Sequence, residues 1–191
     1  MIKISDDLLL RPVNPEDANA LFSLTDSDRE YLREWLPWVD GTKTNEDTIN
    51  YIAFSQKGEK DGTLLNLSIV WNGEVVGITG FNNIDRTNRV ATIGYWLGSE
   101  YQGNGIMTRA VHALTDFAFK QLFMNKVEIR AAVENKKSRS IPERLKYTQE
   151  GTLRSNEWLY DHYVDHAVYG ILADEWHNDS NSSINKSFYS K

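Results

Sequence analysis

The chain contains no cysteine among its 191 residues. This absence excludes disulfide bonds, zinc–thiolate sites and cysteine nucleophiles. No apolar run approaches the roughly 18 residues that a membrane-spanning helix requires. The N-terminal segment carries Asp6 and Asp7 and has no signal-peptide pattern. We therefore expect a cytoplasmic protein that does not associate with membranes.

An excess of basic residues is also absent. Asp and Glu number 27 against 21 Lys and Arg, which gives a net charge of −6 at pH 7. Domains that bind nucleic acids usually carry a basic face, so we expect no direct nucleic-acid partner. An acidic balance suits a cationic substrate such as an amine, although it also serves solubility alone. Six Trp residues indicate a substantial core and an aromatic-lined cavity.

The first third of the chain predicts one short strand followed by helices. The strand covers residues 8–11, and Asn14-Pro15-Glu16-Asp17 then opens a helix with Asn14 as its cap. An aromatic segment covers residues 31–38, and residues 44–57 have apolar side chains at helical spacing.

The middle of the chain predicts an antiparallel meander. Asn72-Gly73 separates apolar runs at residues 64–71 and 74–81, and Asn-Gly favours a hairpin because both turn positions need a positive φ. A third strand is expected at residues 90–97. A strongly amphipathic helix at residues 105–122 follows it.

The last third predicts the end of an α/β domain. A strand at residues 126–133 follows the amphipathic helix, and this order favours a parallel pair of strands with a right-handed crossover. A short helix at residues 138–145, with Ser140 and Glu143 as a capping box, comes next. Closing strands are expected at residues 154–159 and 164–172.

The C-terminal end is rich in Asn, Ser and Lys. No internal repeat and no second domain are evident. We expect one domain over residues 1–176 and a polar tail over residues 177–191.

The most informative segment, residues 94–108, reads Gly-Tyr-Trp-Leu-Gly-Ser-Glu-Tyr-Gln-Gly-Asn-Gly-Ile-Met-Thr. A strand ends there, a glycine-containing turn follows, and a helix begins. A helix N-terminus presents unpaired backbone N–H groups, and glycines let a phosphate approach them closely. The segment therefore predicts a diphosphate site, although a Gly-x-Gly turn also serves simply to connect elements. Thr108 stands where a dinucleotide pattern needs its third glycine, and no P-loop is present.

This segment resembles the coenzyme A loop of the GNAT acetyltransferases, which reads Gln/Arg-x-x-Gly-x-Gly/Ala. Met107 stands where that family usually has its last small residue. The branch that acetylates the N-termini of ribosomal proteins instead reads Gln-Gly-x-Gly-Ile-Met/Val-Thr, and residues 102–108 follow this version. Further segments in family order lie at residues 9–12, 35–38, 94–97, 134–145 and 150–151, so the resemblance covers residues 8–176.

The resemblance implies an α/β (α+β) fold with a mixed, mostly antiparallel seven-stranded sheet flanked by helices. Its central parallel pair splays apart and admits acetyl-coenzyme A, the expected co-substrate. No metal is implied, and the four histidines have no metal-ligand pattern. The residues implied to bind the cofactor are Trp96, Leu97, Gln102, Gly103, Asn104, Gly105, Ile106, Met107, Thr108, Asn135 and Ser138.

Two residues are implied to handle protons. Ser138 is expected to protonate the departing thiolate, although a hydroxyl at a helix start also serves as a cap. Many family members use a tyrosine four residues further on, where this chain has Pro142. Glu157 occupies the branch's position for a general base that accepts a proton from the acceptor ammonium. The alternative for Glu157 is a solvent-facing strand residue.

Other residues keep two interpretations. Asn135 contacts the pantetheine arm in the family, or it is a turn residue or helix cap. Lys136, Lys137 and Arg139 reach a phosphate or stay solvated. In relatives the acceptor site lies around Tyr31, Trp35 and Trp38, and the alternative for these three is packing between helices.

The resemblance favours direct transfer of an acetyl group to the α-amine of a protein N-terminus, particularly a ribosomal one, in a ternary complex. It also allows a homodimer. Three alternatives stay open: an acetyltransferase for a small amine, a coenzyme A-binding sensor without catalysis, and an unrelated α/β phosphate binder.

Overall fold

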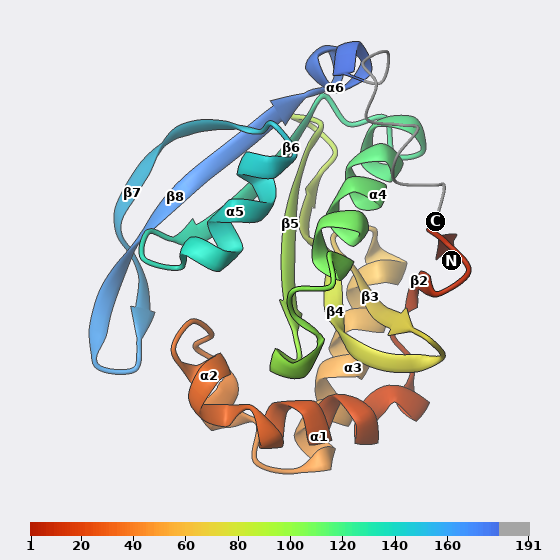
Figure 1. The fold of residues 1–191 in the computed structure, drawn as a ribbon, viewed down its shortest axis with the longest axis vertical. Helices are drawn as coiled ribbons and strands as arrows, with labels where there is room; N and C mark the ends of the chain where they lie inside the picture. The colour runs from red at the N-terminus through yellow and green to blue at the C-terminus, as the bar shows by residue number, and fades with distance from the viewer. Residues whose placement is uncertain (180–191) are drawn as a thin grey trace.

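The computed structural model describes residues 1–179 and contains one eight-stranded sheet (Figure 1). The strands lie in the order β1-β2-β3-β4-β5-β6-β8-β7, and neighbours are antiparallel except for β5 and β6. The strands are β1 (Ile2–Lys3), β2 (Leu8–Pro12), β3 (Leu65–Trp71), β4 (Glu74–Asp85), β5 (Val90–Leu97), β6 (Lys126–Ala132), β7 (Thr148–Leu159) and β8 (His162–Leu172). The helices are α1 (Ala18–Ser27), α2 (Arg29–Arg33), α3 (Asn45–Asp61), α4 (Ile106–Lys120), α5 (Lys136–Arg144) and α6 (Ala173–Asp179), with short 3-10 helices η1 (Pro15–Asp17), η2 (Val39–Gly41) and η3 (Ser99–Tyr101).

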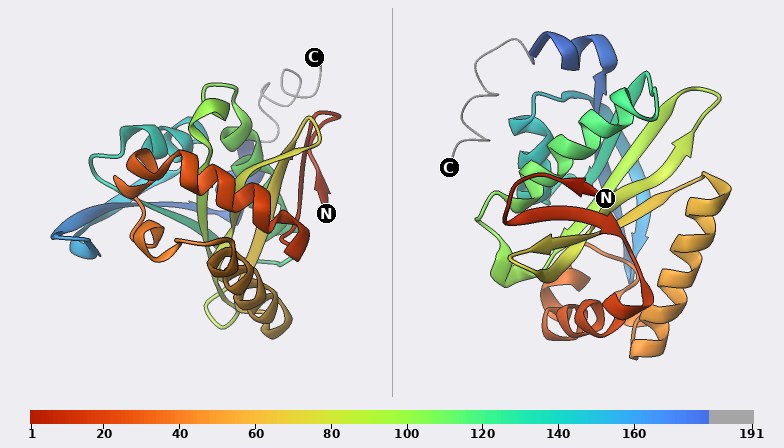
Figure 2. Two further views of the ribbon diagram at one scale, coloured as in Figure 1. Left: turned by 90° about the horizontal axis from the view of Figure 1, so that it is seen from below. Right: turned by 90° about the vertical axis from the view of Figure 1, so that its right-hand side faces the viewer.

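Helices cover both faces of the sheet, as the two views of Figure 2 show. α4 and α5 pack on one face, where the larger core includes Leu10, Ile93 and Leu114. α1 and α3 pack on the other face, where a smaller core joins Leu21 and Ile52 to the strand residue Ile78. The predicted mixed α/β fold is confirmed.

The amphipathic pattern of α4 fixes the position of its N-terminus. Ala110, Val111, Leu114 and Ala118 recur at the helical period and are completely buried in the larger core. This apolar stripe faces the sheet, and the short connection between Leu97 and Ile106 keeps the first turn of α4 beside the C-terminal end of β5.

The parallel pair of strands separates part of the way along its length. β5 and β6 stay in register only as far as Ile93 and Ile129, although β5 continues to Leu97 and β6 to Ala132. Beyond that point β5 remains paired with β4, and β6 with β8. The predicted splay is therefore present, and it leaves the sheet intact on both sides of the gap.

A buried ion pair fixes the first helical segment against β2. Asp17 is 3% exposed and accepts hydrogen bonds from both terminal nitrogens of Arg11, at 2.6 and 2.7 Å. It also accepts from Ser68 Oγ at 2.7 Å and from the N–H of Asn14 at 3.1 Å. Burial alone would raise the pKa of Asp17, but these donors together hold it below its ordinary value.

Two strands differ most from the sequence prediction. β1 adds an eighth strand to the predicted seven, because Ile2 and Lys3 pair with Leu10 and Leu9 of β2. β7 begins at Thr148, well before the predicted start at residue 154. Its register against β8 shifts twice, and Ser155 takes a positive φ of 49°. Such irregularities break the alternating pattern by which a strand is recognised in sequence.

The start of α5 also differs from the prediction. The helix begins at Lys136, and Asn135 is its cap because Asn135 Oδ1 accepts from the N–H of Ser138 at 3.0 Å. The predicted capping box is wrong, since Ser140 Oγ donates to the Lys137 carbonyl instead. Asn135 lies three residues before Ser138, the spacing at which a cap side chain binds a backbone N–H of the first turn. A cap at Ser140 would leave this N–H of Ser138 unpaired.

The C-terminal region is described as far as Asp179. α6 reaches that residue and so crosses the expected boundary between domain and tail. The rest of the predicted tail, residues 180–191, lies outside the described residues. Within residues 1–179, no helix is long and apolar enough to span a membrane.

Candidate active site

A cavity of about 970 Å³ opens where β5 and β6 separate. Its wall comes from α2, the end of β5, the loop before α4, the first turn of α4, and one face of α5. Every residue predicted to bind the cofactor lies in this wall, and so do Tyr31 and Trp35. Trp38 and Glu157 do not line it. These placements bring most of the candidate residues together, while their roles stay predictions.

Two glycines in left-handed conformations shape the loop before α4. Gly103 has a φ of 81°, and Gly105, the N-cap of α4, has a φ of 69°. Other residues are strained there, which accounts for both glycines. Asn104 Nδ2 closes the loop by donating to the carbonyl groups of Tyr101 and Gln102. No side chain caps α4, so the N–H groups of its first turn favour an anion at the cavity wall.

Three basic side chains line the same cavity. Arg109 pairs with Asp7 at 3.2 Å, and Lys137 Nζ donates to Gln102 Oε1 at 3.3 Å. Arg144, in the last turn of α5, donates to Thr108 Oγ1 at 2.6 Å. Together with the start of α4, they make this part of the cavity suitable for phosphate groups.

Of the three basic residues that the sequence analysis considered for a phosphate, only Lys137 lines the cavity. Arg139 turns away from the cavity, donating to Tyr169 Oη at 2.8 Å and to the Val133 carbonyl at 2.7 Å. Lys136 does not line the cavity either. Arg144 escaped the sequence analysis, although its spacing of seven from Lys137 places both on one face of a helix.

Ser138 lies in the first turn of α5 and contacts Tyr95 of β5. Ser138 Oγ donates to Tyr95 Oη at 3.2 Å, and Tyr95 Oη donates to the Ser138 carbonyl at 3.0 Å. The Ser138 hydroxyl is therefore not the helix cap, a role that Asn135 takes. Burial raises the pKa of Tyr95, so this phenol keeps its proton. Tyr95 lines the cavity but had no predicted role.

The aromatic residues predicted for the acceptor site lie on α2 and the segment after it. Tyr31 Oη accepts from Gln102 Nε2 at 2.7 Å, so α2 contacts the cofactor loop directly. The ring centroids of Trp38 and Trp96 are 5.8 Å apart. Trp38 is therefore placed by packing on the end of β5, and it is 37% exposed.

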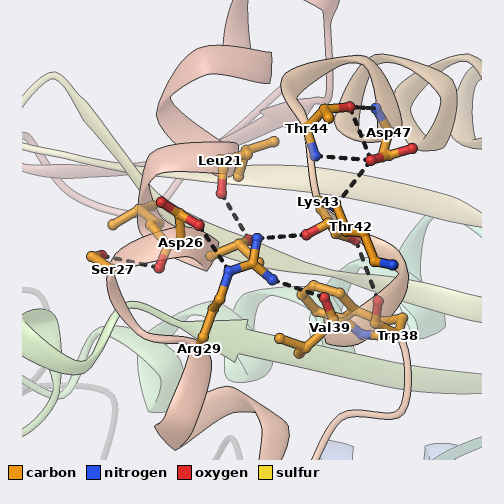
Figure 3. Close-up of polar contacts among 12 residues, drawn as sticks. Leu21, Asp26, Ser27, Arg29, Trp38, Val39, Thr42, Lys43, Thr44 and Asp47 are labelled. Atoms are coloured by element: carbon orange, nitrogen blue, oxygen red, sulfur yellow. Dashed lines mark hydrogen bonds and ion pairs between the residues drawn. The ribbon is translucent and has the colours of Figure 1, made fainter.

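Arg29 holds the segment that carries these aromatic residues (Figure 3). Its guanidinium donates to Asp26 Oδ1 at 2.8 Å, to the Val39 carbonyl at 3.1 Å and to the Thr42 carbonyl at 2.7 Å. These bonds join the end of α1 to the segment before α3. The segment that carries Trp35 and Trp38 is therefore held in place at both ends by hydrogen bonds from Arg29.

A second cavity, of about 830 Å³, shares Trp35 with the first. Arg33 also lines it but is already engaged, since it pairs with Asp40 at 2.9 Å and lies 3.8 Å over the ring of Tyr160. The lining is acidic on balance and favours a cationic ligand. Its carboxylates come from α2 and the residue after it, the turn between β6 and α5, and the β7–β8 hairpin; they are Glu30, Glu34, Glu134, Asp161 and Asp165.

Glu157 lies on β7, outside both cavities. Its Oε2 is 3.4 Å from Nε2 of His166 on β8, and its side chain is 32% exposed. His166 alternates along β8 with Ala167 and Tyr169, which belong to the core beneath α4 and α5. Glu157 and His166 therefore occupy the opposite face of the sheet, the face on which Trp96 packs.

Residues 7–148 match the family model described as an acetyltransferase (GNAT) domain. The chain belongs to the GNAT acetyltransferase family. YdaF of Bacillus subtilis (strain 168), provisionally named a ribosomal N-acetyltransferase, is 32% identical over 93% of this chain and 97% of its own length. The ribosomal-protein-serine acetyltransferase of Escherichia coli (strain K12) is 29% identical over 91% of this chain and 97% of that protein. RimL, a ribosomal L7/L12 α-N-protein acetyltransferase solved with coenzyme A, superimposes with a TM-score of 0.87 at 28% identity, covering 91% of this chain and 98% of RimL.

This GNAT acetyltransferase uses acetyl-coenzyme A as its acetyl donor. The first cavity fits the donor, because the uncapped start of α4 and the nearby Lys137 and Arg144 suit its phosphates. The gap between β5 and β6 suits its narrow pantetheine arm. Among residues 1–179, no group of three or more His, Asp or Glu side chains is placed to hold a metal ion.

Replacing Gly105 of this GNAT enzyme by alanine is expected to weaken coenzyme A binding about tenfold. An added Cβ meets nothing within 4 Å in the free protein. The left-handed backbone costs about 1–2 kcal/mol for a residue other than glycine. The Cβ also hinders the close approach of a phosphate to the N–H groups of α4.

Gly73→Ala is the matched control for this substitution. Gly73 has a φ of 87°, meets nothing within 4 Å, and lies in the β3–β4 turn outside both cavities. Thermal unfolding should show a similar loss of stability for both variants. Titration calorimetry should show weaker coenzyme A binding for Gly105→Ala alone, and equal affinities would contradict the assignment of the loop.

Proposed function

We propose that this acetyltransferase modifies the α-amine of a protein N-terminus, with a ribosomal protein as acceptor. Trp35 carries the proposal, because it lines both the donor cavity and the acidic cavity next to it. An acceptor in the second cavity therefore lies next to the donor. The printed names of two relatives, a ribosomal-protein-serine acetyltransferase and RimL, support a ribosomal acceptor. This acceptor implies a cytoplasmic enzyme, and we assign the activity to one domain over residues 1–176.

The residues around the gap divide the chemistry between them. The carboxylates of the second cavity attract the acceptor ammonium. Glu157 lies outside the second cavity but pairs with Val164, which lines it. From there it accepts, through one water, the proton that the ammonium must lose before its nitrogen can attack. Backbone N–H groups at the open end of β5 polarise the thioester carbonyl. After the attack the nitrogen loses its second proton to solvent as the C–S bond breaks. Ser138 donates a hydrogen bond to the departing sulfur, which takes a proton from solvent to form the thiol.

Direct transfer between the two bound substrates fits this arrangement. The chain has no cysteine that could carry the acetyl group. Holding the amine next to the thioester removes most of the entropic cost of bringing two molecules together, which supplies a large part of the rate.

Thiol release from acetyl-coenzyme A, measured with a panel of acceptors, tests the proposed acceptor. Peptides that begin with Ser or Ala should react at least about 100-fold faster, in kcat/KM, than the same peptides with a blocked α-amine and an internal Lys. Mass spectrometry of the product should place the acetyl group on the first residue. Modification of the internal Lys would contradict the choice of the α-amine.

The acidic lining of the second cavity also favours a small polyamine as a second candidate acceptor. The same panel should therefore include a linear polyamine. If the enzyme acetylated the polyamine rapidly and acetylated no peptide, the acceptor would be a polyamine and not a protein N-terminus. Coenzyme A binding without turnover of any acceptor would instead favour a sensor and contradict both candidates.

A further inference from the structure

α5 lacks one of its own hydrogen-bond donors. In an α-helix the carbonyl of each residue accepts from the N–H four residues later. Pro142 lies inside α5, four residues after Ser138, and proline has no N–H. The carbonyl of Ser138 therefore cannot receive the usual bond from within its helix.

Tyr95 supplies a donor to this carbonyl from another element. Its hydroxyl, on β5, donates to the Ser138 carbonyl at 3.0 Å. The Tyr95 ring packs against the larger core, so the hydroxyl approaches from a fixed strand. Because the phenol keeps its proton, it is a constant donor rather than an acid.

The same phenol also contacts the side chain of Ser138. Ser138 Oγ donates to Tyr95 Oη at 3.2 Å, so Tyr95 holds both the backbone and the hydroxyl of one residue. Both residues line the donor cavity. When the Ser138 hydrogen turns toward a departing sulfur by rotation about the Cβ–Oγ bond, the Tyr95 hydroxyl can donate to Oγ in its place, so Oγ stays where it is.

We infer that Tyr95 is a positioning residue for Ser138. It replaces the backbone donor that Pro142 removes and fixes Ser138 Oγ at the wall of the donor cavity. This inference rests on the role proposed above for Ser138.

Tyr95→Phe removes the hydroxyl and retains the packed ring. We expect kcat to fall about tenfold and the KM for acetyl-coenzyme A to stay within twofold, because the donor contacts elsewhere in the cavity are unchanged. Ser138→Ala should lower kcat by a similar factor. Since the two residues act together, the double variant should be no more than twofold slower than Ser138→Ala alone.

A rescue variant separates positioning from simple stabilisation of α5. Pro142→Ala restores an N–H to residue 142, which can then bond to the Ser138 carbonyl. In the Tyr95→Phe background it should recover the melting temperature but not kcat, because the second bond, to Ser138 Oγ, is still missing. Pro142→Ala alone serves as the reference for both measurements.

The outcomes distinguish this inference from the proposed function. If Tyr95→Phe/Pro142→Ala recovers kcat as well, Tyr95 only stabilises the helix and the inference is overturned. The same holds if Tyr95→Phe leaves kcat unchanged while Ser138→Ala lowers it. If Ser138→Ala itself has wild-type kcat, the proposed role of Ser138 fails, and the inference fails with it.

Discussion

Glu157→Gln is expected to lower kcat/KM for a peptide acceptor by about 100- to 10,000-fold, the usual contribution of a positioned general base. Glutamine keeps the size of the side chain but cannot accept a proton. The carboxylate lies on the face of the sheet opposite α4 and α5, 3.4 Å from His166. An α-amino group has a pKa near 8, so below that pH the acceptor arrives as an ammonium that must lose a proton. The defect should therefore be largest at pH 6–7 and shrink above pH 8.

Glu150→Gln is the matched control for Glu157→Gln. Glu150 lies on the same strand and, like Glu157, outside both cavities, but its carboxylate is engaged in a surface ion pair with Lys126 at 2.6 Å. Its replacement should leave kcat/KM within twofold of the wild type at every pH. The assignment of Glu157 as base would be contradicted if Glu157→Gln stayed within threefold of the wild type at pH 6.5. Thermal unfolding of both variants excludes a folding defect as the cause.

Arg11→Met is expected to lower the free energy of unfolding by about 3–5 kcal/mol, because it leaves a buried carboxylate without its charged partner. Asp17 is 3% exposed and accepts two short bonds from Arg11. Adding Asp17→Asn removes the buried charge that Arg11→Met leaves unpaired. The double variant should therefore recover part of the lost free energy of unfolding. Urea unfolding at pH 7 measures these differences. Coenzyme A binding should be unchanged, because neither residue lines a cavity.

The effect of Arg11→Met should depend on pH in one direction. The pKa of Asp17 is lower in the folded protein than its ordinary value of 3.8. The ion pair therefore stabilises the fold above that value, and the stabilisation is lost as pH falls through the lowered pKa. The gap between Arg11→Met and the wild type should narrow below pH 4.

Lys3→Met is the control for the buried pair. Lys3 and Asp6 form an ion pair of similar length, 2.8 Å, with side chains 66% and 99% exposed. Because exposed pairs contribute little, this variant should unfold like the wild type. If Arg11→Met lowered the free energy of unfolding no more than Lys3→Met does, the buried carboxylate of Asp17 would not need its charged partner, and the prediction would be wrong.

The cofactor loop could be predicted because its features lie in one short segment. The glycines at 103 and 105 and the helix that follows are visible in sequence, and the structure gives both glycines a positive φ. The same applies to Asn72-Gly73, whose turn joins β3 to β4. In each case the backbone conformation depends on the residue itself and its immediate neighbours.

Features that depend on distant contacts could not be predicted. Tyr95 meets Ser138 across 43 positions, and nothing near either residue in the sequence points to the other. The predicted Ser140 cap failed because Asn135 binds the same turn earlier. The full length of β7 was missed because its register shifts interrupt the alternation of side chains. Arg144 was within reach of sequence reasoning, since helical spacing alone aligns it with Lys137.

The first cavity relies mainly on backbone groups to bind its ligand, whereas the second relies on side chains. The donor cavity depends on backbone N–H groups at the start of α4, which most side-chain substitutions leave in place. The second cavity is lined by side chains of α2 and the β7–β8 hairpin, whose tip lies at the surface. If the second cavity holds the acceptor as proposed, sequence drift at its side chains alters the choice of acceptor while donor binding survives. The same scaffold can acquire new acceptors through a few surface substitutions.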